Sequence, residues 1–374
     1  MRKKLVLLLA LTLCLSMVLS GCGGGGVATN NGEAGGTSPG SGETFTWKVQ
    51  GYTAANTTFD DYGKHWAELV ETMSGGRLKI EWYPADSLVS AFDVPNAVRD
   101  GILDAEYGYS GLWTSLEYGA PLFCSIPGEF SDQFDMLYWL QYGGGMDIWR
   151  EMLEPYNVTV FPAGILDAEI FLWTNKPIKS MDDLKSMKLR MMPLMGDILA
   201  ANDCSVVFLP GGEIIPSMER SVIDAGEFST PALDETFGFQ DVAKYYHKPG
   251  FHQPTSIQEL VINKDSWNKL PADLQAIVEA ACNSNVMWTW MENGVRNQAA
   301  MERFSAKGVE EVILPDEVVN TLQDWTNKWF EEKMKEDPFI DKVRKSQMDF
   351  MKSWVPYKTN MNIPYPDWAY ELAK

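Results

Sequence analysis

The sequence predicts an α/β protein with two lobes and long C-terminal helices, and three observations support this prediction. Strand and helix patterns alternate early in the chain and again in its second half, which is typical of parallel sheets with crossover helices. The segment from about residue 45 to residue 374 is longer than one hydrophobic core usually serves. After Trp267 the pattern is mostly helical.

The N-terminus has the features of an export signal. Residues 2–4 read RKK, residues 5–19 are largely apolar, and Cys22 follows in the motif LSGC. The apolar run is shorter than the roughly 20 residues that span a bilayer, so we predict a removable signal peptide over residues 1–21. LSGC resembles the bacterial lipobox, in which the cysteine becomes the lipidated first residue. Ordinary cleavage nearby, which leaves a free thiol, is the alternative.

Residues 22–44 are expected to form a lipid-anchored flexible tether. After Cys22 the chain reads GGGGVATNNGEAGGTSPGSGE, which has too few apolar side chains to offset the entropy lost on folding. A Gly/Ser-rich coil of this length reaches roughly 25 Å. The tether would hold the body just off a membrane surface, and no other segment approaches a transmembrane length.

The charge and the cysteines exclude several classes of partner and site. The formal net charge is −20, so the chain repels nucleic acid and anionic lipid, and no basic cluster offsets this charge. The cysteines beyond the tether are Cys124, Cys204 and Cys282, whose spacing is too wide for a metal knuckle. One disulfide among them is the alternative that this spacing leaves open.

Lobe I is predicted from a strand, a helix and a second strand. TFTWKVQGY alternates like a strand, residues 59–73 read as a helix that stops at two glycines, and RLKIEWYP alternates again. In the second half, EIFLWTN, KLRMM and SVVFLP are strand-like, while SMDDLKSM and GDILAAND are helical. We assign residues 45–167 plus about 258–285 to lobe I. Residues 168–257 plus about 286–338 form lobe II and a spanning helix.

The helical C-terminal part has apolar faces. A helix is predicted to start at Pro271 in LPADLQAIVEAA. A later helix has one apolar face, made by Val318, Leu322, Trp325 and Trp329. The apolar side of a final helix over residues 340–354 consists of Ile340, Val343, Phe350, Met351 and Trp354. This last face is expected to pack on the body of its own chain or on a second subunit.

Catalytic signatures are not found in the sequence. It has no H-E-x-x-H or G-K-[ST] motif, no G-x-S-x-G motif beyond the glycine-rich tether, and no G-x-G-x-x-G after a strand. We interpret His65, His247 and His252 as isolated surface or core residues, because they are scattered along the chain. With 51 acidic residues, chance carboxylate pairs are too common to indicate a glycosidase. Most of the 14 tryptophans are better explained as core residues than as sugar platforms.

Arg190 stands inside an apolar run that reads MKLRMMPLM. A buried charge without a partner is costly. Arg190 therefore reaches solvent, pairs with an acidic residue of its own chain, or binds an anion.

Several stretches together resemble the extracytoplasmic solute-binding proteins of tripartite ATP-independent periplasmic (TRAP) transporters, the DctP-like family. They are MSGGRLKIEWYPADSL, AVRDGILDAEYG, NKPIKSMDDLKSMKLRM, GEIIPSMERSVIDAGE and VINKDSWNKLPADLQ. YGGGMDIWREM and YYHKPGF are similar to the branch that binds 2-oxo acids and lactate-like hydroxy acids. The resemblance covers nearly the whole mature chain. It implies a type II-like periplasmic-binding-protein fold with a ligand cleft between the lobes.

The resemblance also implies a function without catalysis. Such proteins capture a small organic acid outside the cytoplasm and deliver it to two integral membrane subunits. The family holds the carboxylate with an arginine after a DLKGLKIR-type turn, and Arg190 in DLKSMKLR has that position. A guanidinium matches a carboxylate with two parallel hydrogen bonds. The expected substrate-binding residues are Arg190, Trp173, Glu169, Phe228, Tyr109 and Trp113.

In the oxo-acid branch a metal ion bridges protein and ligand. The corresponding ligands here are Glu169, Glu227, the carbonyl of Phe228, and Gln253. The branch usually has Gln at the first place and Glu at the last, so this chain has the two exchanged at equal charge. Oxygen ligands suit Ca²⁺ or Na⁺, and no organic cofactor is expected.

Two other functions are weighed against this one. A sugar- or peptide-binding lipoprotein of an ATP-driven (ABC-type) transporter would lack a fixed arginine for a carboxylate. A surface-anchored hydrolase would turn its substrate over. Dimers that share a C-terminal helix occur in the oxo-acid branch, which makes residues 339–374 a candidate element for a homodimer.

Overall fold

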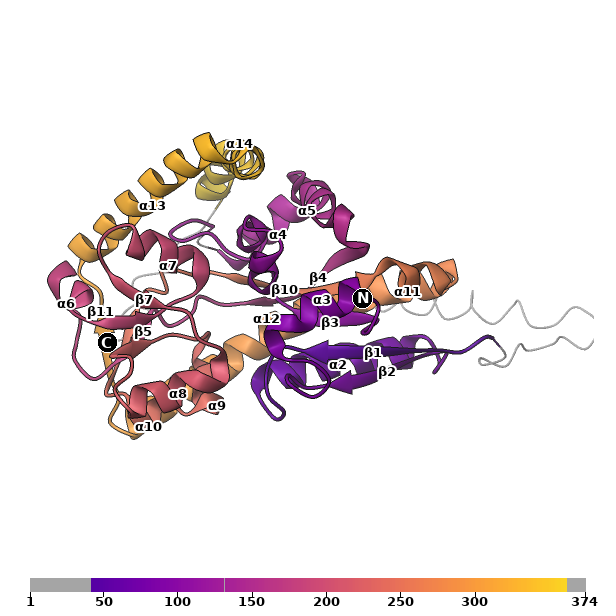
Figure 1. Ribbon diagram of the computed structural model, residues 1–374, viewed down its shortest axis with the longest axis horizontal. Coiled ribbons are helices and arrows are strands. Elements are labelled where there is room, and N and C mark those ends of the chain that lie inside the picture. The colour runs from indigo at the N-terminus through magenta and orange to yellow at the C-terminus, as the bar shows by residue number, and fades with distance from the viewer. Residues whose placement is uncertain (1–41, 131, 362–374) are drawn as a thin grey trace, which may run out of the picture. The chain divides into compact units, whose positions relative to one another are not determined.

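The structure is a computed structural model that describes residues 42–130 and 132–361 (Figure 1). Cys22, the predicted signal peptide and most of the predicted tether lie outside these residues. The described chain forms a five-stranded and a six-stranded sheet, with helices beside each. Both sheets belong to one compact unit that starts at Gly42. We call the parts around the five-stranded and six-stranded sheets lobe I and lobe II.

The sheet of lobe I has the strand order β2-β1-β3-β10-β4. Strand β1 pairs in parallel with β2 and β3, whereas β10 is antiparallel to β3 and β4. The strands are β1 (Phe45–Gly51), β2 (Leu78–Tyr83), β3 (Ala105–Gly108), β4 (Val158–Leu166) and β10 (Ser256–Asn263). Strand β10 is buried along its whole length although it contains Gln258 and Glu259.

Helix α2 (Thr58–Met73) follows β1, as the sequence predicts. The Thr57 hydroxyl caps it by accepting a hydrogen bond from the amide of Asp60. Gly75 and Gly76 after its end have φ of 62° and 79°, a conformation that favours glycine. The other helical segments of this lobe are η1 (Ala91–Asp93), α3 (Val94–Arg99), η2 (Ser110–Ser115), η3 (Ala120–Phe123), α4 (Gln133–Tyr142), α5 (Gly145–Leu153), η4 (Glu154–Tyr156) and α11 (Lys264–Lys269).

The sheet of lobe II has the strand order β11-β9-β5-β8-β6-β7. Strand β5 is antiparallel to β8 and β9, whereas β6 is parallel to β7 and β8. The strands are β5 (Leu172–Thr174), β6 (Lys188–Arg190), β7 (Ser205–Val207), β8 (Ala225–Gly226), β9 (Tyr245–Lys248) and β11 (Glu310–Ile313). The helices of this lobe are α6 (Met181–Lys185), α7 (Pro193–Ala200), α8 (Gly211–Glu219), α9 (Pro231–Phe237) and α10 (Phe239–Val242).

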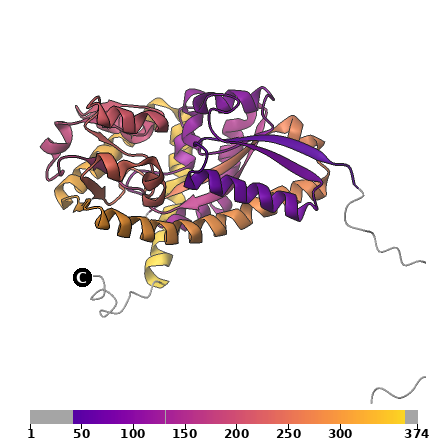
Figure 2. The same cartoon turned by 90° about the horizontal axis from the view of Figure 1, so that it is seen from below.

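Helix α12 (Ala272–Ala306) connects the lobes. It packs against β4 and α2 of lobe I and against α9 of lobe II, and it runs beneath both in Figure 2. Amide side chains within the helix bind it to each lobe. Asn285 donates to the carbonyl of Ala163 at 2.8 Å, and the Oδ1 of Asn297 accepts from the amide of Ala232 at 3.0 Å. The helix is therefore a shared element of the two lobes.

Helices α13 (Asp316–Glu336) and α14 (Pro338–Met361) follow, and α14 is longer than predicted. Ile340 and Val343 on its predicted apolar face are buried, and Trp354 donates its Nε1–H to Asp135 of α4 at 2.6 Å. The structure thus places this face on the body of its own chain, the first of the two expected partners. A dimer through α14 would have to use other side chains.

Two sequence expectations need correction or completion. The region after Trp267 is not wholly helical, because β11 pairs there with β9. Most of this strand is exposed, so its sequence EEVI carries no apolar pattern. Cys124, Cys204 and Cys282 are free and buried, so no disulfide joins them. None of the helices described combines the length and the apolar character needed to cross a bilayer.

Candidate ligand-binding site

Four strand ends of lobe II meet at one edge of its sheet. Strands β9, β5 and β8 are neighbours, and β5 is antiparallel to the other two. The segment before β5 therefore lies beside the segments that follow β8 and β9. Strand β6 is parallel to β8 and ends at the same edge. The side chains brought together are Glu169 before β5, Arg190 of β6, Glu227 after β8, and His252 after β9.

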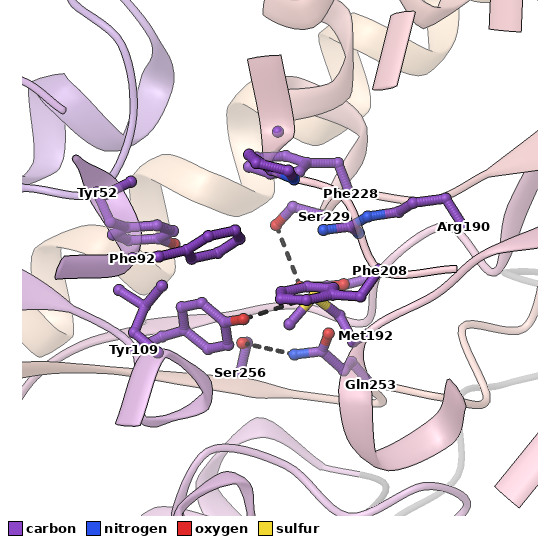
Figure 3. Close-up of a pocket in the computed structure, with 15 residues that line it drawn as sticks. Tyr52, Phe92, Tyr109, Arg190, Met192, Phe208, Phe228, Ser229, Gln253 and Ser256 are labelled. Atoms are coloured by element: carbon purple, nitrogen blue, oxygen red, sulfur yellow. Dashed lines mark hydrogen bonds between the residues drawn. The ribbon is translucent and has the colours of Figure 1, made fainter. Parts of the chain in front are cut away.

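A pocket of about 540 Å³, partly open to solvent, lies between this edge and lobe I (Figure 3). Glu169 and Arg190 line it from lobe II, together with Met192, Ser229 and Gln253. Its aromatic wall consists of Tyr52, Phe92, Tyr109, Phe208 and Phe228. A wall of this kind with few charges suits a small, largely apolar anion.

Arg190 is buried and most of its donors are occupied. Its Nε and Nη2 donate to the carbonyl of Leu209 at 3.2 and 3.1 Å. Its Nη1 donates to the backbone carbonyl and to Oε1 of Glu227 at 2.7 and 2.8 Å. Of the five N–H groups of a guanidinium, one on Nη2 is left. The fork expected to grip a carboxylate twice therefore has room for a single hydrogen bond.

Two aromatic rings enclose the same guanidinium. Its central carbon lies 5.5 Å from the ring centre of Phe208 and 5.7 Å from that of Phe228. Phe208 also packs on Phe92 of lobe I, with ring centroids 5.2 Å apart. Phe92 and Phe208 are 40% and 42% exposed. This aromatic pair joins the two lobes beside the pocket.

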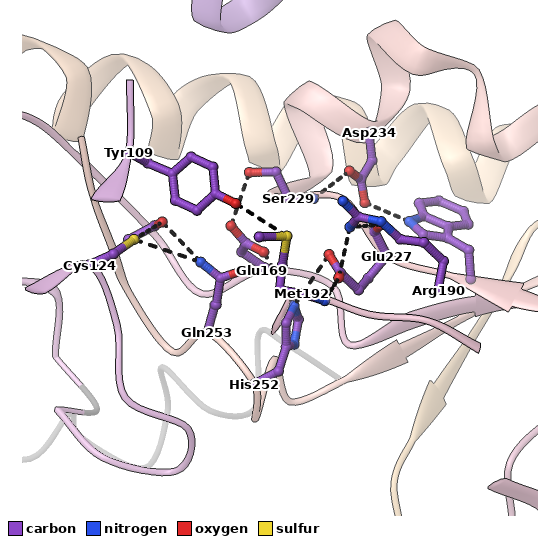
Figure 4. A network of polar contacts seen from close by, with 12 residues as sticks. Tyr109, Cys124, Glu169, Arg190, Met192, Glu227, Ser229, Asp234, His252 and Gln253 are labelled. Atoms are coloured by element: carbon purple, nitrogen blue, oxygen red, sulfur yellow. Dashed lines mark hydrogen bonds and ion pairs between the residues drawn. The ribbon is translucent and has the colours of Figure 1, made fainter. Parts of the chain in front are cut away.

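A cluster of Glu169, Glu227 and His252 lies next to Arg190 (Figure 4). All three are buried, and one ligand atom of each lies within 4.8 Å of the others. The Nε2 of His252 is 3.2 Å from Oε2 of Glu169 and 3.7 Å from Oε2 of Glu227. None of these three atoms makes a hydrogen bond of acceptable geometry with another described residue. Buried polar atoms without partners are rare and indicate a missing ligand or water.

The outer oxygens of both carboxylates are held in place. Ser229 donates its hydroxyl to Oε1 of Glu169 at 3.2 Å. The Oε1 of Glu227 accepts from Arg190 and, at 2.7 Å, from the amide of Met192. Each glutamate thus has one oxygen fixed by hydrogen bonds and one oxygen without a hydrogen bond. Carboxylates that bind metal ions are commonly held by hydrogen bonds in this way.

The charges in the cluster shift one another's pKa values. Burial raises the pKa of Glu169. Burial acts in the same direction on Glu227, but the nearby guanidinium of Arg190 and His252 bring its pKa below the ordinary value. Burial opposes protonation of His252, yet the two carboxylates raise its pKa to about 9. In this structure His252 is therefore the cation between two acids.

The backbone positions the cluster as tightly as the side chains do. The amide of Glu169 donates to the carbonyl of Gln253 at 3.1 Å. A Cβ on Gly250 would come within 1.9 Å of the carbonyl oxygen of Glu169. Only glycine allows this approach, so the turn that carries His252 is fixed to the segment that carries Glu169.

The other predicted site residues divide into two groups. Tyr109, Phe228 and Gln253 line the pocket, and the Nε2 of Gln253 donates to Ser256 at 3.2 Å. Trp113 and Trp173 do not line it. They are buried in the lobes, where their indole N–H groups donate to Glu106 and Asp234. Their placement does not fit the predicted contact with a ligand, because each indole is enclosed by its own lobe.

His252 is the site residue that the sequence analysis missed. It was interpreted as an isolated histidine because the three histidines are far apart along the chain. Its signal was its position directly before Gln253, a predicted metal ligand. The other members of the cluster come from segments more than twenty residues away, and only the strand order brings them together.

This fold and this cleft define a class, the two-lobed proteins that enclose a solute between lobes. Residues 50–337 match the family of bacterial extracellular solute-binding proteins, family 7 (DctP). The chain belongs to this family. Its members are substrate-binding receptors of transporters outside the cytoplasm, so the protein is a binding protein and not an enzyme.

Known relatives agree with this assignment. A monocarboxylate 2-oxoacid-binding periplasmic protein of Nostoc is 30% identical over 307 residues, covering 81% of this chain and 83% of the relative. A TRAP periplasmic solute-binding protein of Colwellia psychrerythraea, with bound calcium and pyruvate, superposes with a TM-score of 0.82 at 25% identity. One of Pseudoalteromonas atlantica, with sodium and pyruvate, gives 0.81 at 25%. Both alignments cover 89% of this chain and 100% of the other. The predicted two-lobed fold is confirmed.

Proposed function

We propose that this chain captures a small 2-oxo or 2-hydroxy monocarboxylate between its lobes and delivers it to the membrane subunits of a TRAP transporter. The observation that carries the proposal is one free Arg190 N–H at the pocket, together with an unpartnered oxygen of Glu169, which lines the same pocket, and one of Glu227 beside it. The relatives that bind pyruvate and 2-oxo acids support it. Because the chain belongs to the DctP family, a sugar- or peptide-binding protein of an ABC-type transporter is no longer a competing proposal.

Arg190 is the proposed carboxylate clamp. Its remaining Nη2–H donates to one carboxylate oxygen of the acid, and its charge attracts the anion. Glu227 and Glu169 together outweigh the charge of Arg190. A further cation at this site is therefore needed before an anion is attracted. The aromatic wall excludes water and strengthens these interactions once the lobes close.

A metal ion is the second proposed element. The residues fit one, because buried oxygens of Glu169 and Glu227 lack partners and both carboxylates are supported from behind. Gln253 and the carbonyl of Phe228 are the further proposed ligands, and Ca²⁺ or Na⁺ is the cation found in the similar structures. Such an ion would accept two neighbouring oxygens of a 2-oxo or 2-hydroxy acid. The protein's own part is to fix its carboxylates and to bind the acid's outer oxygen at Arg190.

The membrane-proximal features remain proposals from the sequence. We propose a lipid anchor on Cys22, which lies outside the described residues, and a tether that leads to the body at Phe45. The homodimer also remains a proposal. Light scattering of the soluble body tests it, and a monomer at all concentrations would contradict it.

Thermal unfolding with a panel of acids tests the ligand class. Pyruvate, lactate and longer 2-oxo acids should each be added with and without calcium, and acetate and a sugar serve as controls. A ligand at 100 times its Kd raises the free energy of unfolding by about 2.7 kcal/mol. Stabilisation by acetate equal to that by pyruvate would contradict selection for 2-substituted acids, and stabilisation by the sugar alone would contradict the function.

A further inference from the structure

We propose that Glu169, Glu227 and His252 bind a divalent first-row transition-metal ion in preference to Ca²⁺ or Na⁺. This inference rests on the proposed function, since it names the class of cation at the same site. His252 is the nitrogen ligand that distinguishes this cluster from a site made of oxygen ligands alone.

The buried polar atoms without hydrogen bonds in this region belong to one cluster of side chains. Oε2 of Glu169, Oε2 of Glu227 and both ring nitrogens of His252 have no aligned hydrogen-bond partner among the described residues. The side chains that carry them are at most 5% exposed. Apart from the ion-pair contacts of His252 with the two glutamates, three side chains from three segments thus leave these atoms without partners in one place, as a closed-off cation site requires.

The spacing of these atoms suits a small ion. Bonds of 2.0–2.1 Å to nitrogen and oxygen in tetrahedral geometry place neighbouring ligands about 3.3 Å apart. The Nε2 of His252 lies 3.2 and 3.7 Å from the two glutamate oxygens. These two separations bracket the ideal value, and the two glutamate ligand atoms lie within 4.8 Å of each other.

The charge balance favours a divalent ion. Glu169 and Glu227 contribute two negative charges, Arg190 one positive charge, and the bound acid one negative charge. A divalent ion would bring the sum of these four charges to zero, whereas a sodium ion would leave one uncompensated negative charge in a buried site.

The ligand type then selects among divalent ions. Ca²⁺ and Mg²⁺ prefer oxygen ligands throughout, whereas an imidazole nitrogen favours zinc, copper, nickel, cobalt or iron. For a transition-metal ion the protein's ligands would be Glu169, Glu227 and His252 alone, without Gln253 and the Phe228 carbonyl. Two carboxylates and one imidazole resemble the three-ligand sets of zinc sites that keep a position open for a bound molecule. The acid would take that open position, beside Arg190.

Metal titration of the chelator-treated protein tests the proposal. Zn²⁺, Co²⁺ and Ca²⁺ should be titrated by calorimetry without any acid. Zn²⁺ and Co²⁺ are expected to bind at least about tenfold more tightly than Ca²⁺, and Cu²⁺ should give an electron paramagnetic resonance spectrum with nitrogen hyperfine splitting.

Histidine variants provide the specific comparison. His252→Gln should weaken Zn²⁺ and Co²⁺ at least about tenfold, because even outer-shell changes cost 10–100-fold, and it should leave Ca²⁺ nearly unchanged. The nitrogen splitting should also disappear. His65→Gln is the matched control, since His65 stacks on Trp288 away from the pocket. His252→Asn repeats the comparison, and circular dichroism verifies the fold of each variant.

Two results would overturn the proposal. One is Ca²⁺ binding as tightly as Zn²⁺ to the parent protein. The other is unchanged Zn²⁺ affinity in folded His252→Gln or His252→Asn. Acid binding is measured separately, by adding pyruvate to calcium-loaded protein. Pyruvate binding with no zinc preference rejects only the transition-metal inference, whereas zinc binding with no affinity for any acid rejects the proposed function.

Discussion

Arg190 and Glu227 form a buried ion pair, Nη1 to Oε1 at 2.8 Å, in which each partner keeps one polar group without a hydrogen-bond partner among the described residues. Arg190 keeps an Nη2–H, and Glu227 keeps Oε2. The acidic partner fixes the guanidinium beside the pocket, and the guanidinium keeps Glu227 ionised.

The substitution Arg190→Lys is expected to weaken acid binding more than tenfold, a loss of at least about 1.4 kcal/mol. Lysine keeps the charge but cannot bond Leu209, Glu227 and a ligand together. Calorimetry measures the affinity, and chemical unfolding measures the cost in stability, which is about 3–5 kcal/mol when a buried pair loses one partner. Parent-like affinity in the folded variant would show that the clamp lies elsewhere.

The exchanged pair Glu169 and Gln253 gives a second prediction. Glu169→Gln removes a ligand charge and should weaken metal and acid binding together. Glu169→Gln with Gln253→Glu restores the charge and should recover much of both, since the two residues are joined by a backbone hydrogen bond. Calorimetry of the single and double variants decides this. Equal losses in both would mean that Gln253 does not face the ion.

The third prediction concerns Phe208, which contacts Phe92 across the lobes. Phe208→Ala removes that contact and one face of the Arg190 enclosure, so acid affinity should fall about 3- to 10-fold, the range of a lost aromatic contact. Tyr142→Ala is the control, because Tyr142 is 84% exposed on α4. Equal affinities for the two variants would leave the aromatic pair without a role in closure.

The fourth prediction concerns pH and two buried acids, Glu106 and Glu259, on neighbouring strands of lobe I. Both are buried, and three of their four carboxylate oxygens have no partner among the described residues. Burial raises the pKa of Glu106 to about 8, and burial with the charge of Glu106 raises the pKa of Glu259 well above its ordinary value. The folded state therefore binds more protons than the unfolded state above about pH 4.5.

The sign follows from this proton excess. The contribution of this pair to the free energy of unfolding should be fully present below about pH 4.5. It should be lost as the pH rises toward 8, by up to about 1.4 kcal/mol per pH unit for each proton. Urea unfolding between pH 5 and 8 measures the slope. Glu259→Gln should reduce it, while Glu331→Gln, on the exposed surface of α13, should not. A flat profile in the parent protein would mean that water or an ion already compensates the pair.

The fifth prediction is that Cys22 carries a lipid. Cys22→Ser should release a soluble form or block processing, because the acylated residue is lost. Mass spectrometry of the membrane fraction gives the answer, and unmodified Cys22 there would refute the anchor.

Much of the fold was predictable because its signals are local. The alternation in TFTWKVQGY gave β1, and the apolar spacing before Gly75 gave α2. Strand β11 was not predictable, since an exposed edge strand such as EEVI needs no apolar residues. The face of α14 was recognisable as apolar, but nothing in it distinguished the body of the chain from a second subunit.

The site was only partly predictable because it depends on strand order. Arg190 could be found from its apolar surroundings and its turn, yet its bonds to Leu209 and Glu227 come from distant segments. The role of His252 follows from β9 lying beside β5, a neighbourhood that spacing along the chain does not reveal. Trp173 was predicted to contact the ligand, but its side chain packs against Phe239 inside lobe II. Spacing along the chain does not reveal this packing either.

The close approach of Gly250 to Glu169 has a consequence for the transport cycle. The three cluster residues belong to segments around one sheet, locked backbone to backbone, and none comes from lobe I. A cation held by these three side chains would therefore not need the lobes to close before it binds. An acid bound between the lobes would lose Tyr52, Phe92 and Tyr109 when the lobes part, whereas the cation would keep its three protein ligands. The same bound ion would then serve successive molecules of acid.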